Sequence, residues 1–440
     1  MPDVSFHDLS ALGADERAGL LKRAETDLSV FAEKVRPIIH AVKDEGDAAL
    51  LRFAKELDKA NISDGNLKVS EAEFDAAFDK VEKDVIESIR FGIGNIRHFH
   101  EEQRPETMWL KEVRPGAYAG DRYTAIASVA LYVPRGKGAF PSVTMMTSVP
   151  AVIAGVPQIA IVTPPTADGS VDAATLVAAR LAGVDTVYKC GGAQAVAAVA
   201  YGTETVKPAV KIVGPGSPWV VAAKNLLSSV IDTGLPAGPS EAIIFADDSV
   251  DGGLAALDLL IEAEHGPDSS AYLVTHSRKV AEAALAALPG HWSRMTEQRV
   301  EFSRAVLTGK RGGIVLTASL EDSYRFINDY APEHLEILSR EPFAHLGHIT
   351  EAAEILMGLH TPVTLANFVL GPNAVLPTSR WARTYGPLSV TDFLKRSSVG
   401  YVTSAAYPVL AKHARRLARY EGFSSHENAV SEIRDGYLGA

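Results

Sequence analysis

Two stretches of the chain pair a carboxylate with an imidazole at spacings that suit chemistry. Glu262 and His265 lie three residues apart at the end of the apolar run GGLAALDLLIEAEHGP, and on a helix this spacing places them on one face of the last turn. An oxygen donor and an imidazole so placed can bind one Zn²⁺. A solvated helix end is the alternative, because histidine is favoured near the negative end of the helix dipole.

The second pair, Glu333 and His334, stands side by side in NDYAPEHLEIL, after a proline and ahead of a strand-like run. A carboxylate and an imidazole have different protonation ranges and together can remove a proton from an alcohol or a water. Adjacent side chains on a strand diverge, so this role requires a bend in the chain. A surface pair is the alternative. Nearer the C-terminus, Glu421 and His426 in EGFSSHENAV read by themselves as surface residues.

Three glycine-rich turns, YVPRGKG, YKCGGAQA and VGPGSPW, each connect a strand-like run to a helix-like run. Such turns present free N–H groups to a ligand phosphate at a helix N-terminus. None of them is the GxGxxG fingerprint, and glycine is common at these turns for steric reasons, but three together favour a nucleotide. Arg135 and Lys137 in the first turn either receive an anionic group or are solvated loop cations.

The elements that must position these residues alternate between strands and helices. Residues 15–104 carry apolar positions at spacings of three and four, which predicts amphipathic helices. From about Tyr123 onward, short β-rich runs alternate with Ala-rich helical runs, which indicates parallel sheets in an α/β fold. The expected strands are ASVALYVP, QIAIVTPP, DTVYKC, VKIVG, EAIIFAD, SAYLVTH, GGIVLT and HLEILS.

Two joints rich in proline and glycine, YVPRGKGAFP and GLPAGPSE, bracket one unit and leave the other to be assembled from sequence on both sides. We therefore expect two Rossmann-like parallel-sheet domains, one of them discontinuous, with small helical N- and C-terminal extensions. The expected boundaries are an N-terminal extension at 1–28, a discontinuous domain carrying the metal and acid–base residues at 29–131 plus 239–388, a nucleotide-binding domain at 132–238, and a C-terminal helical segment at 389–440.

The composition argues against several classes of protein. A formal net charge of -11 gives no long-range attraction for nucleic acid, and the 43 Lys and Arg residues are scattered. A single cysteine, Cys190, excludes an intrachain disulfide framework and fits a reducing compartment, so a cytoplasmic location is expected. The most apolar stretch is broken by Pro and Gly well short of a membrane span, so we expect neither a membrane anchor nor a targeting signal.

Across nearly the whole chain, the motifs resemble those of the histidinol dehydrogenase family, whose members are NAD- and zinc-dependent oxidoreductases. The matching stretches, in the family's order, are YVP, GGAQAVAAVAYGTE, KIVGPG, AGPSE, AEHG, YAPEHLEI, VLPT and EGFSSHENAV. The metal ligands that the resemblance implies are Glu262, His265, Asn367 and His426. The proton-transfer residues that it implies are Glu333 and His334. The implied cofactor contacts are Tyr132, Gln194 and Ser217. The implied substrate contacts are Ser240, Glu262, His265, His334, Asn367, Ala374, Glu421 and His426.

The sequence departs from the family pattern at the metal site and at the substrate site. Glu262 stands where the family has a metal-binding Gln, and Asn367 stands where it has a metal-binding Asp. Because the two changes compensate, two imidazoles, one carboxylate and one neutral oxygen donor are still offered to the metal. Ala374 replaces a substrate-facing His, and Ser217 replaces a cofactor-facing Asn. Alanine cannot supply the polar contact, which argues against histidinol as the substrate.

From these residues and the resemblance we expect an NAD-dependent alcohol dehydrogenase with bound Zn²⁺. It would oxidise a small polar primary alcohol other than histidinol, via the aldehyde to the carboxylate. The resemblance also implies a homodimer in which the C-terminal segment completes the neighbouring active site. The alternatives that stay open are a genuine L-histidinol dehydrogenase of histidine biosynthesis, a zinc hydrolase that activates a metal-bound water, and a non-catalytic nucleotide-binding or interaction protein.

Overall fold

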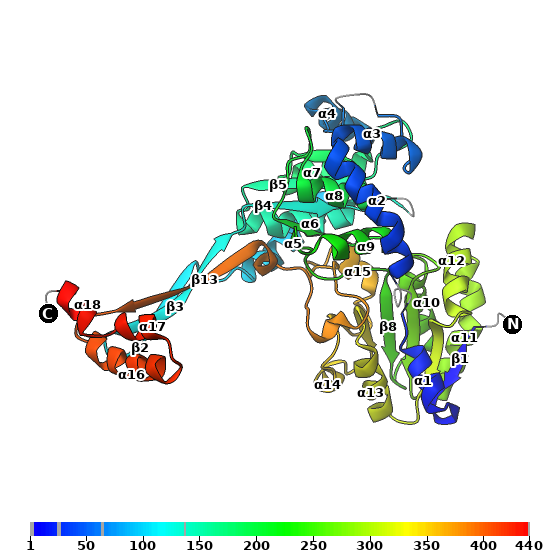
Figure 1. Cartoon of the computed structure of the whole chain (residues 1–440). Coiled ribbons are helices and arrows are strands. Elements are labelled where there is room, and N and C mark those ends of the chain that lie inside the picture. Colours follow the sequence, from blue (N-terminus) through cyan, green and yellow to red (C-terminus); the bar gives the residue numbers. More distant parts are fainter. Residues whose placement is uncertain (1–3, 24–27, 63–65, 136–137, 439–440) are drawn as a thin grey trace. The chain divides into compact units, whose positions relative to one another are not determined.

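A computed structural model describes residues 4–23, 28–62, 66–135 and 138–438 (Figure 1). The chain forms two compact units. Unit 1 comprises Met1–Arg104 and Ile126–Phe393, and unit 2 comprises Pro105–Ala125 and Leu394–Ala440. Unit 1 contains two parallel sheets, and unit 2 contains an antiparallel one. Within the described ranges, no helix is both long and apolar enough to cross a bilayer.

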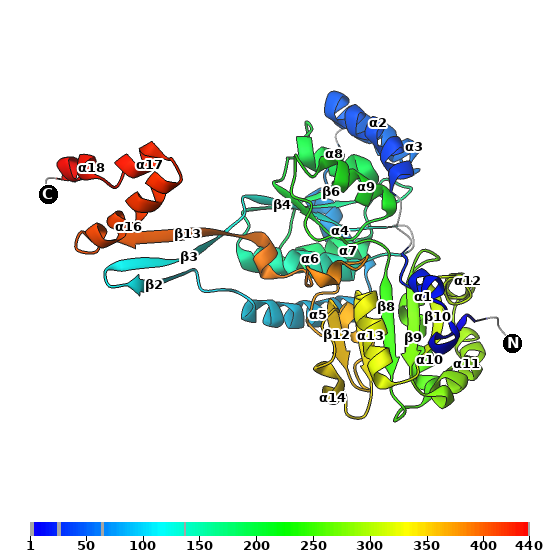
Figure 2. The ribbon, with the colours of Figure 1, turned by 60° about the horizontal axis from the view of Figure 1, so that its bottom comes forward.

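The larger sheet of unit 1 has six parallel strands. Their order across the sheet is β1 (Phe6–Asp8), β10 (Gly312–Leu316), β9 (Ser270–Thr275), β8 (Glu241–Ala246), β11 (His334–Leu338) and β12 (Glu354–Met357). Figure 2 shows β8, β9 and β10 beside one another. The register pairs His334 with Ala242 and with Glu354, so the strands β8, β11 and β12 all begin at the same edge, the amino edge of the sheet.

Helices cover both faces of this sheet. One face packs against α10 (Gly252–Ala263), α11 (Arg278–Trp292), α12 (Glu297–Leu307) and α15 (Val363–Phe368). The other packs against α1 (Ala14–Leu20) and α13 (Leu320–Tyr330). Leu338 belongs to the first of these cores and Leu335 to the second. Because side chains alternate along a strand, His334 lies on the face that α10 covers. The remaining short elements are η1 (Leu9–Ala11), α14 (Phe343–Leu346), η2 (Trp381–Arg383) and η3 (Val390–Phe393).

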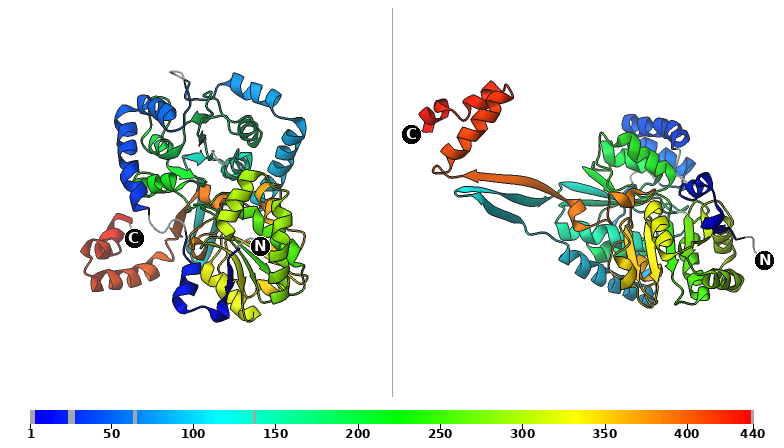
Figure 3. Two further views of the ribbon diagram at one scale, coloured as in Figure 1. Left: turned by 90° about the vertical axis from the view of Figure 1, so that its right-hand side faces the viewer. Right: turned by 90° about the horizontal axis from the view of Figure 1, so that it is seen from below.

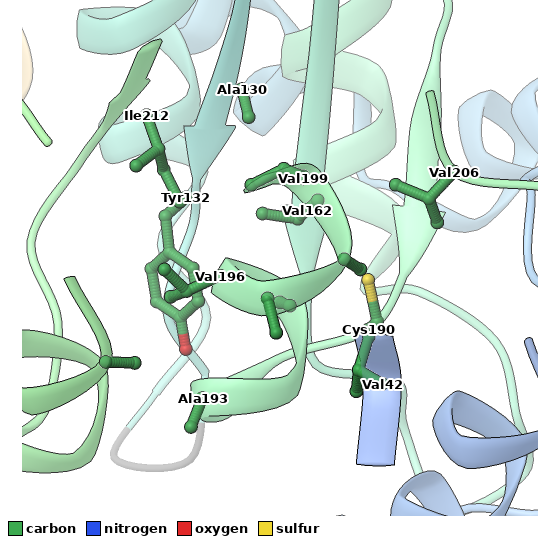
Figure 4. Packing of buried hydrophobic residues seen from close by; sticks show 14 of the residues in the cluster. Val42, Ala130, Tyr132, Val162, Cys190, Ala193, Val196, Val199, Val206 and Ile212 are labelled. Atoms are coloured by element: carbon green, nitrogen blue, oxygen red, sulfur yellow. The ribbon is translucent and has the colours of Figure 1, made fainter. Parts of the chain in front are cut away.

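The smaller sheet of unit 1 has four parallel strands. Their order is β6 (Val187–Lys189), β5 (Gln158–Thr163), β4 (Ser128–Tyr132) and β7 (Lys211–Val213). One face packs against α2 (Ser29–Glu45), α3 (Asp47–Glu56), α8 (Gly192–Tyr201) and α9 (Pro218–Leu227). The other side carries α4 (Glu71–Lys80), α5 (Lys83–Glu102), α6 (Pro141–Ala154) and α7 (Ala173–Ala182). Figure 4 shows the first core, in which the ring of Tyr132 lies near Val196 of α8.

Unit 2 is an antiparallel ribbon followed by helices (Figure 3). Its strands, in the order β13 (Leu394–Val402), β3 (Ala117–Ala125) and β2 (Met108–Arg114), precede α16 (Tyr407–Tyr420), α17 (Ser424–Asn428) and α18 (Glu432–Leu438). Strand β2 is exposed along its whole length. Large apolar side chains of this unit, among them Trp109, Tyr420 and Tyr437, are also exposed.

The α/β fold with parallel sheets and helical termini is confirmed, and each expected strand is present. The structure differs from the expectation in three places. Residues 1–28 were expected to be a helical extension, but β1 forms there and pairs with β10 at the edge of the six-stranded sheet. Residues 389–440 were expected to be helical, but β13 forms there because it pairs along its length with β3, which is far away in the chain. Residues 29–131 were expected to join 239–388, but α2 to α5 pack against α6 to α9 around the four-stranded sheet. The other expected boundaries stay predictions.

Candidate active site

Local sequence builds the helix end that carries Glu262 and His265. Helix α10 begins after Asp251, whose side chain accepts a hydrogen bond from Gly253 N at 2.7 Å. Its apolar residues pack on the six-stranded sheet, and the helix ends at Ala263. Glu262 is 1% exposed. The alternative of a solvated helix end is therefore wrong for Glu262.

Glu262 is the centre of a group of polar side chains from three segments. Asn367 Nδ2 donates to Glu262 Oε1 at 2.8 Å, and His265 Nδ1 lies 3.0 Å from Glu262 Oε2. Ser240 Oγ lies 3.0 Å from the same His265 nitrogen. Burial alone raises the pKa of Glu262, but the imidazoles of His265 and His334 outweigh burial and hold that pKa below its ordinary value. The carboxylate is therefore charged at neutral pH.

The ligand types of these side chains suit a divalent metal ion. They offer one carboxylate, one imidazole and one amide oxygen, all of which are ligands for such ions. Glu262 Oε2 is buried, and the imidazole nitrogen that lies 3.0 Å from it, His265 Nδ1, is itself a metal-ligand type. Within the described ranges, no group of three or more His, Cys, Asp or Glu side chains is arranged to hold a metal. A complete shell therefore needs the amide of Asn367 and a further ligand.

The chain bends just before Glu333 and His334. Helix α13 ends at Tyr330, and Ala331 adopts a left-handed conformation with φ 52°. His334 Nε2 lies 4.0 Å from Glu333 Oε1, so the two side chains converge as proton transfer requires. Glu333 is 6% exposed and His334 is 3% exposed. The alternative of a surface pair is therefore wrong.

A separate glutamate residue holds each member of this pair. Glu354 Oε2 lies 2.6 Å from His334 Nδ1. The backbone N–H of Glu241 donates to Glu333 Oε2 at 2.7 Å. Burial alone lowers the pKa of His334, but the carboxylates of Glu354 and Glu262 raise it to about 10. Burial raises the pKa of Glu333 well above its ordinary value. Two neighbouring groups with such shifted pKa values are typical of acid–base sites.

The residues expected to contact the cofactor lie at the carboxyl edge of the four-stranded sheet. Tyr132 ends β4, and its Oη accepts a hydrogen bond from Gly192 N at 3.0 Å. Gln194, in the first turn of α8, donates through Nε2 to Asp58 Oδ2 at 3.2 Å. Ser217 precedes α9 and is exposed. This edge is where open α/β sheets bind nucleotides, so the placement suits a cofactor.

Comparison with known protein families matches residues 21–434 to the family described as histidinol dehydrogenase. The chain belongs to the histidinol dehydrogenase family. A Mesorhizobium japonicum protein named histidinol dehydrogenase homolog 2 is 92% identical over 438 residues, with 100% of both chains covered. A histidinol dehydrogenase of Synechocystis sp. is 47% identical over 424 residues, which cover 96% of this chain and 98% of that protein. The crystal structure of histidinol dehydrogenase from Elizabethkingia anophelis covers 100% of both chains, with a TM-score of 0.93 and 29% identity.

Histidinol dehydrogenase family membership makes this protein an NAD-dependent alcohol or aldehyde oxidoreductase, and zinc binding is a general feature of the family.

The structure brings together Ser240, Glu262, His265, Glu333, His334 and Asn367 at the amino edge of the six-stranded sheet. No hydrogen bond or ion pair joins Ala374 to these residues in the described part of the chain; its backbone N–H donates to Met146 Sδ at 3.2 Å. Glu421 and His426 belong to unit 2 and are exposed there. Arg135 is exposed. Lys137 lies outside the described residues.

Sequence reasoning missed several residues that hold this histidinol dehydrogenase family site. Glu354 fixes the imidazole of His334, and Glu241 fixes the carboxylate of Glu333. Glu241 itself pairs with Arg23 from the N-terminal extension. Asp58 accepts the hydrogen bond of Gln194. Glu241 directly follows Ser240 in AGPSE and could have been noticed, whereas the other three stand in segments without a local signal.

Proposed function

We propose that this histidinol dehydrogenase family member is an NAD- and zinc-dependent dehydrogenase of a small polar primary alcohol other than histidinol. It would oxidise the alcohol via the aldehyde to the carboxylate. The observation that carries the proposal is the buried pair of Glu333 and His334, whose nearest side-chain atoms are 4.0 Å apart and which are each held by a separate partner. The pair lies on the same edge as the donors Glu262, His265 and Asn367.

The two residues suit two successive proton transfers. In the first oxidation, His334 Nε2 would accept the hydroxyl proton. In the second, Glu333 would take a proton from the water that adds to the aldehyde. Bound NAD would supply the hydride acceptor for each oxidation. Each alcohol then consumes one water and two NAD. Because the pKa of His334 is about 10, the fraction of neutral imidazole increases as the pH rises above neutrality.

Zinc and the cofactor have separate candidate sites. Glu262, His265 and Asn367 would hold Zn²⁺, and His426 is proposed as the fourth ligand. When bound, Zn²⁺ supplies Lewis-acid polarisation of the alcohol oxygen and offsets the negative charge of Glu262. Tyr132, Gln194 and Ser217 would contact the NAD at the carboxyl edge of the four-stranded sheet. Tyr132 is 3% exposed and Gln194 is 2% exposed, so NAD would touch only a small part of each side chain.

The substrate preference is argued from Ala374. This residue stands where the family has a substrate-facing His, and its surroundings include the thioether of Met146. A histidinol imidazole would find no hydrogen-bond partner in the alanine methyl group, which costs affinity when a polar group is desolvated. A smaller polar alcohol avoids that cost. Ser240, beside His265, would bind the substrate's other polar group.

We propose further that the protein is a homodimer in which Glu421 and His426 of one subunit serve the partner's active site. The exposed apolar side chains of unit 2 support an interaction surface there. Mixing inactive His334→Asn chains with inactive His426→Asn chains should restore about a quarter of the activity if sites are shared between subunits. A mixture that stays inactive, or a monomer in solution, would contradict the shared site.

The experiment that tests the function follows NADH formation with a panel of small polar primary alcohols, with and without a chelator. We expect turnover of at least one alcohol, two NADH per alcohol, and loss of activity with the chelator that added Zn²⁺ restores. Hydrolysis of an ester or amide without alcohol oxidation would instead favour the zinc hydrolase.

A genuine histidinol dehydrogenase is the second candidate. The 47% identity to a Synechocystis protein named histidinol dehydrogenase supports it. L-Histidinol therefore belongs in the same panel. Efficient turnover of histidinol, with the other alcohols much slower, would replace the substrate assignment while leaving the roles of Glu333 and His334 in place.

A further inference from the structure

A backbone donor sets the position of Glu333. Glu241 is the first residue of β8, and its N–H donates to Glu333 Oε2 at 2.7 Å. The place where β8 begins therefore determines where one carboxylate oxygen of Glu333 lies. The other oxygen, Oε1, is the one that lies 4.0 Å from His334 Nε2. A shift of the Glu241 backbone would thus move the acid–base pair apart.

The side chain of Glu241 is anchored by a cation from the N-terminal extension. Arg23 Nε lies 2.8 Å from Glu241 Oε1, and Ser379 N donates to the same oxygen at 2.8 Å. Arg23 is 9% exposed and Glu241 is 3% exposed. A buried carboxylate that loses its cation is strongly disfavoured. Glu241 therefore depends on Arg23 to stay where it is.

Arg23 also binds the segment on the other side of Glu333. Its Nη2 donates to Tyr330 O at 2.6 Å, and its guanidinium carbon lies 3.4 Å from the centroid of the Tyr330 ring. Tyr330 ends α13, three positions before Glu333, and its Oη is 2.6 Å from Ser270 Oγ. One guanidinium thus joins the start of β8 to the end of α13, the two segments that place Glu333.

We propose that Arg23 is a positioning residue for the proton transfer by Glu333: it fixes the start of β8 against the end of α13 and so keeps the Glu241 N–H on Glu333 Oε2. This inference rests on the proposed function of Glu333. A buried ion pair contributes little net stability, whereas a planar guanidinium with several donors in fixed directions is suited to holding geometry. The N-terminal extension is then a part of the active site.

The test compares Arg23→Met and Arg23→Lys with the control Arg17→Met in the zinc-loaded enzyme. Arg17 belongs to α1 of the same extension, is exposed, and donates to the carbonyls of Leu9 and Leu12. We expect Arg23→Met to lower kcat by about 10- to 100-fold, as loss of a supporting partner commonly does. The alcohol KM, zinc content and NADH affinity should stay within about twofold. Arg23→Lys should retain part of the activity, and Arg17→Met all of it.

A double substitution separates positioning from general destabilisation. If Arg23 acts through Glu333, adding Arg23→Met to Glu333→Gln lowers kcat no further, because the interaction is already lost. If the effect of Arg23→Met is the same with and without Glu333, the inference is wrong. An unchanged kcat in Arg23→Met would also overturn it. Should Arg23→Met fail to fold, the same comparison with Arg23→Lys decides.

A structural readout keeps the inference testable if the proposed function fails. Full activity of Glu333→Gln, or no turnover of any alcohol, would remove the proposed role of Glu333. The crystal structure of Arg23→Met then decides the positioning itself. We expect the distance from Glu241 N to Glu333 Oε2 to exceed about 3.5 Å, the limit of a hydrogen bond. A distance still near 2.7 Å would overturn the inference whatever the reaction is.

Discussion

The two parallel sheets of unit 1 use opposite edges. In the six-stranded sheet, the ionisable groups gather at the amino edge, where β8, β11 and β12 begin. In the four-stranded sheet, Tyr132 and Gln194 lie at the carboxyl edge, where β4 ends and α8 begins. The carboxyl edge is the general ligand site of open α/β sheets. The amino edge has no such general role, so its site depends on particular residues.

The two edges also differ in how they hold their groups. At the amino edge, charged groups hold one another: the buried Glu262 with the partly exposed His265, and His334 with Glu354, both of them buried. At the carboxyl edge, a phenol and an amide contact a backbone N–H and one carboxylate. Proton transfer and metal binding need charged groups in fixed positions, as at the amino edge. Binding of a cofactor needs only hydrogen-bonding groups like those at the carboxyl edge. Substitutions should therefore separate into those that change kcat and those that change NAD affinity.

The largest expected effect tests this separation directly. His334→Asn should lower kcat by about a thousandfold, because it removes a general base, and should leave NADH affinity within about twofold. Gln194→Ala at the other edge should weaken NADH binding by about tenfold while kcat at saturating NAD changes little. Steady-state kinetics and fluorescence titration with NADH measure both. If His334→Asn weakened NADH binding as much as it slowed turnover, the two edges would not be separate.

The metal site offers the next largest effect. Glu262→Gln removes one negative charge from the ligand set and should weaken zinc binding by about 10- to 100-fold, whereas Asn367→Asp adds one and should not weaken it. The double variant Glu262→Gln with Asn367→Asp restores the ligand charge and should bind zinc nearly as tightly as the natural protein. Competition with a chromogenic chelator measures the affinities. A double variant that binds zinc as weakly as Glu262→Gln alone would show that position, and not charge, matters at this site.

A smaller effect concerns the partner of His334. Glu354→Gln removes a carboxylate that raises the pKa of His334, so that pKa should fall from about 10. Since base catalysis needs the neutral imidazole, kcat/KM rises with pH in the natural protein, and in the variant this rise should move to lower pH. We also expect about a tenfold lower maximum, because the imidazole loses its orientation.

The matched control is Glu341→Gln. Glu341 is an exposed glutamate beyond the other end of β11. Its substitution should leave the pH profile of kcat/KM unchanged. If the pH profile of kcat/KM were also unchanged in Glu354→Gln, a group other than His334 would control the rate.

The sequence predicts much of the fold because parallel strands buried on both faces read as continuous apolar runs, as in EAIIFA of β8. It does not predict β13, whose partner β3 lies far away in the chain. For the site, the spacing of Glu262 and His265 is a local signal, but it left a solvated helix end as the alternative, and only the folded chain buries Glu262. The partners Glu354 and Arg23 were invisible, because only the folded chain brings them to His334 and Glu241.

The smallest effect tests the carboxyl edge through Asp58. Burial raises the pKa of Asp58 to about 6. Ionisation is therefore less favourable in the folded than in the unfolded protein, and the folded state loses stability as the pH rises from about 4 through 6. Asp58→Asn removes this penalty and can still accept the hydrogen bond of Gln194. It should raise the free energy of unfolding at pH 7 by about 1 to 3 kcal/mol, allowing for partial exposure.

The pH dependence of this gain distinguishes it from a packing effect. Urea unfolding at pH 7 should show the full stabilisation by Asp58→Asn, and the same measurement near pH 3 should show almost none, because Asp58 is then mostly protonated in both states. Asp44→Asn, which changes an exposed residue of α2 nearby in sequence, should alter stability little at either pH. An equal gain from Asp58→Asn at both pH values would show that the gain comes from packing and not from the burial of a charged Asp58.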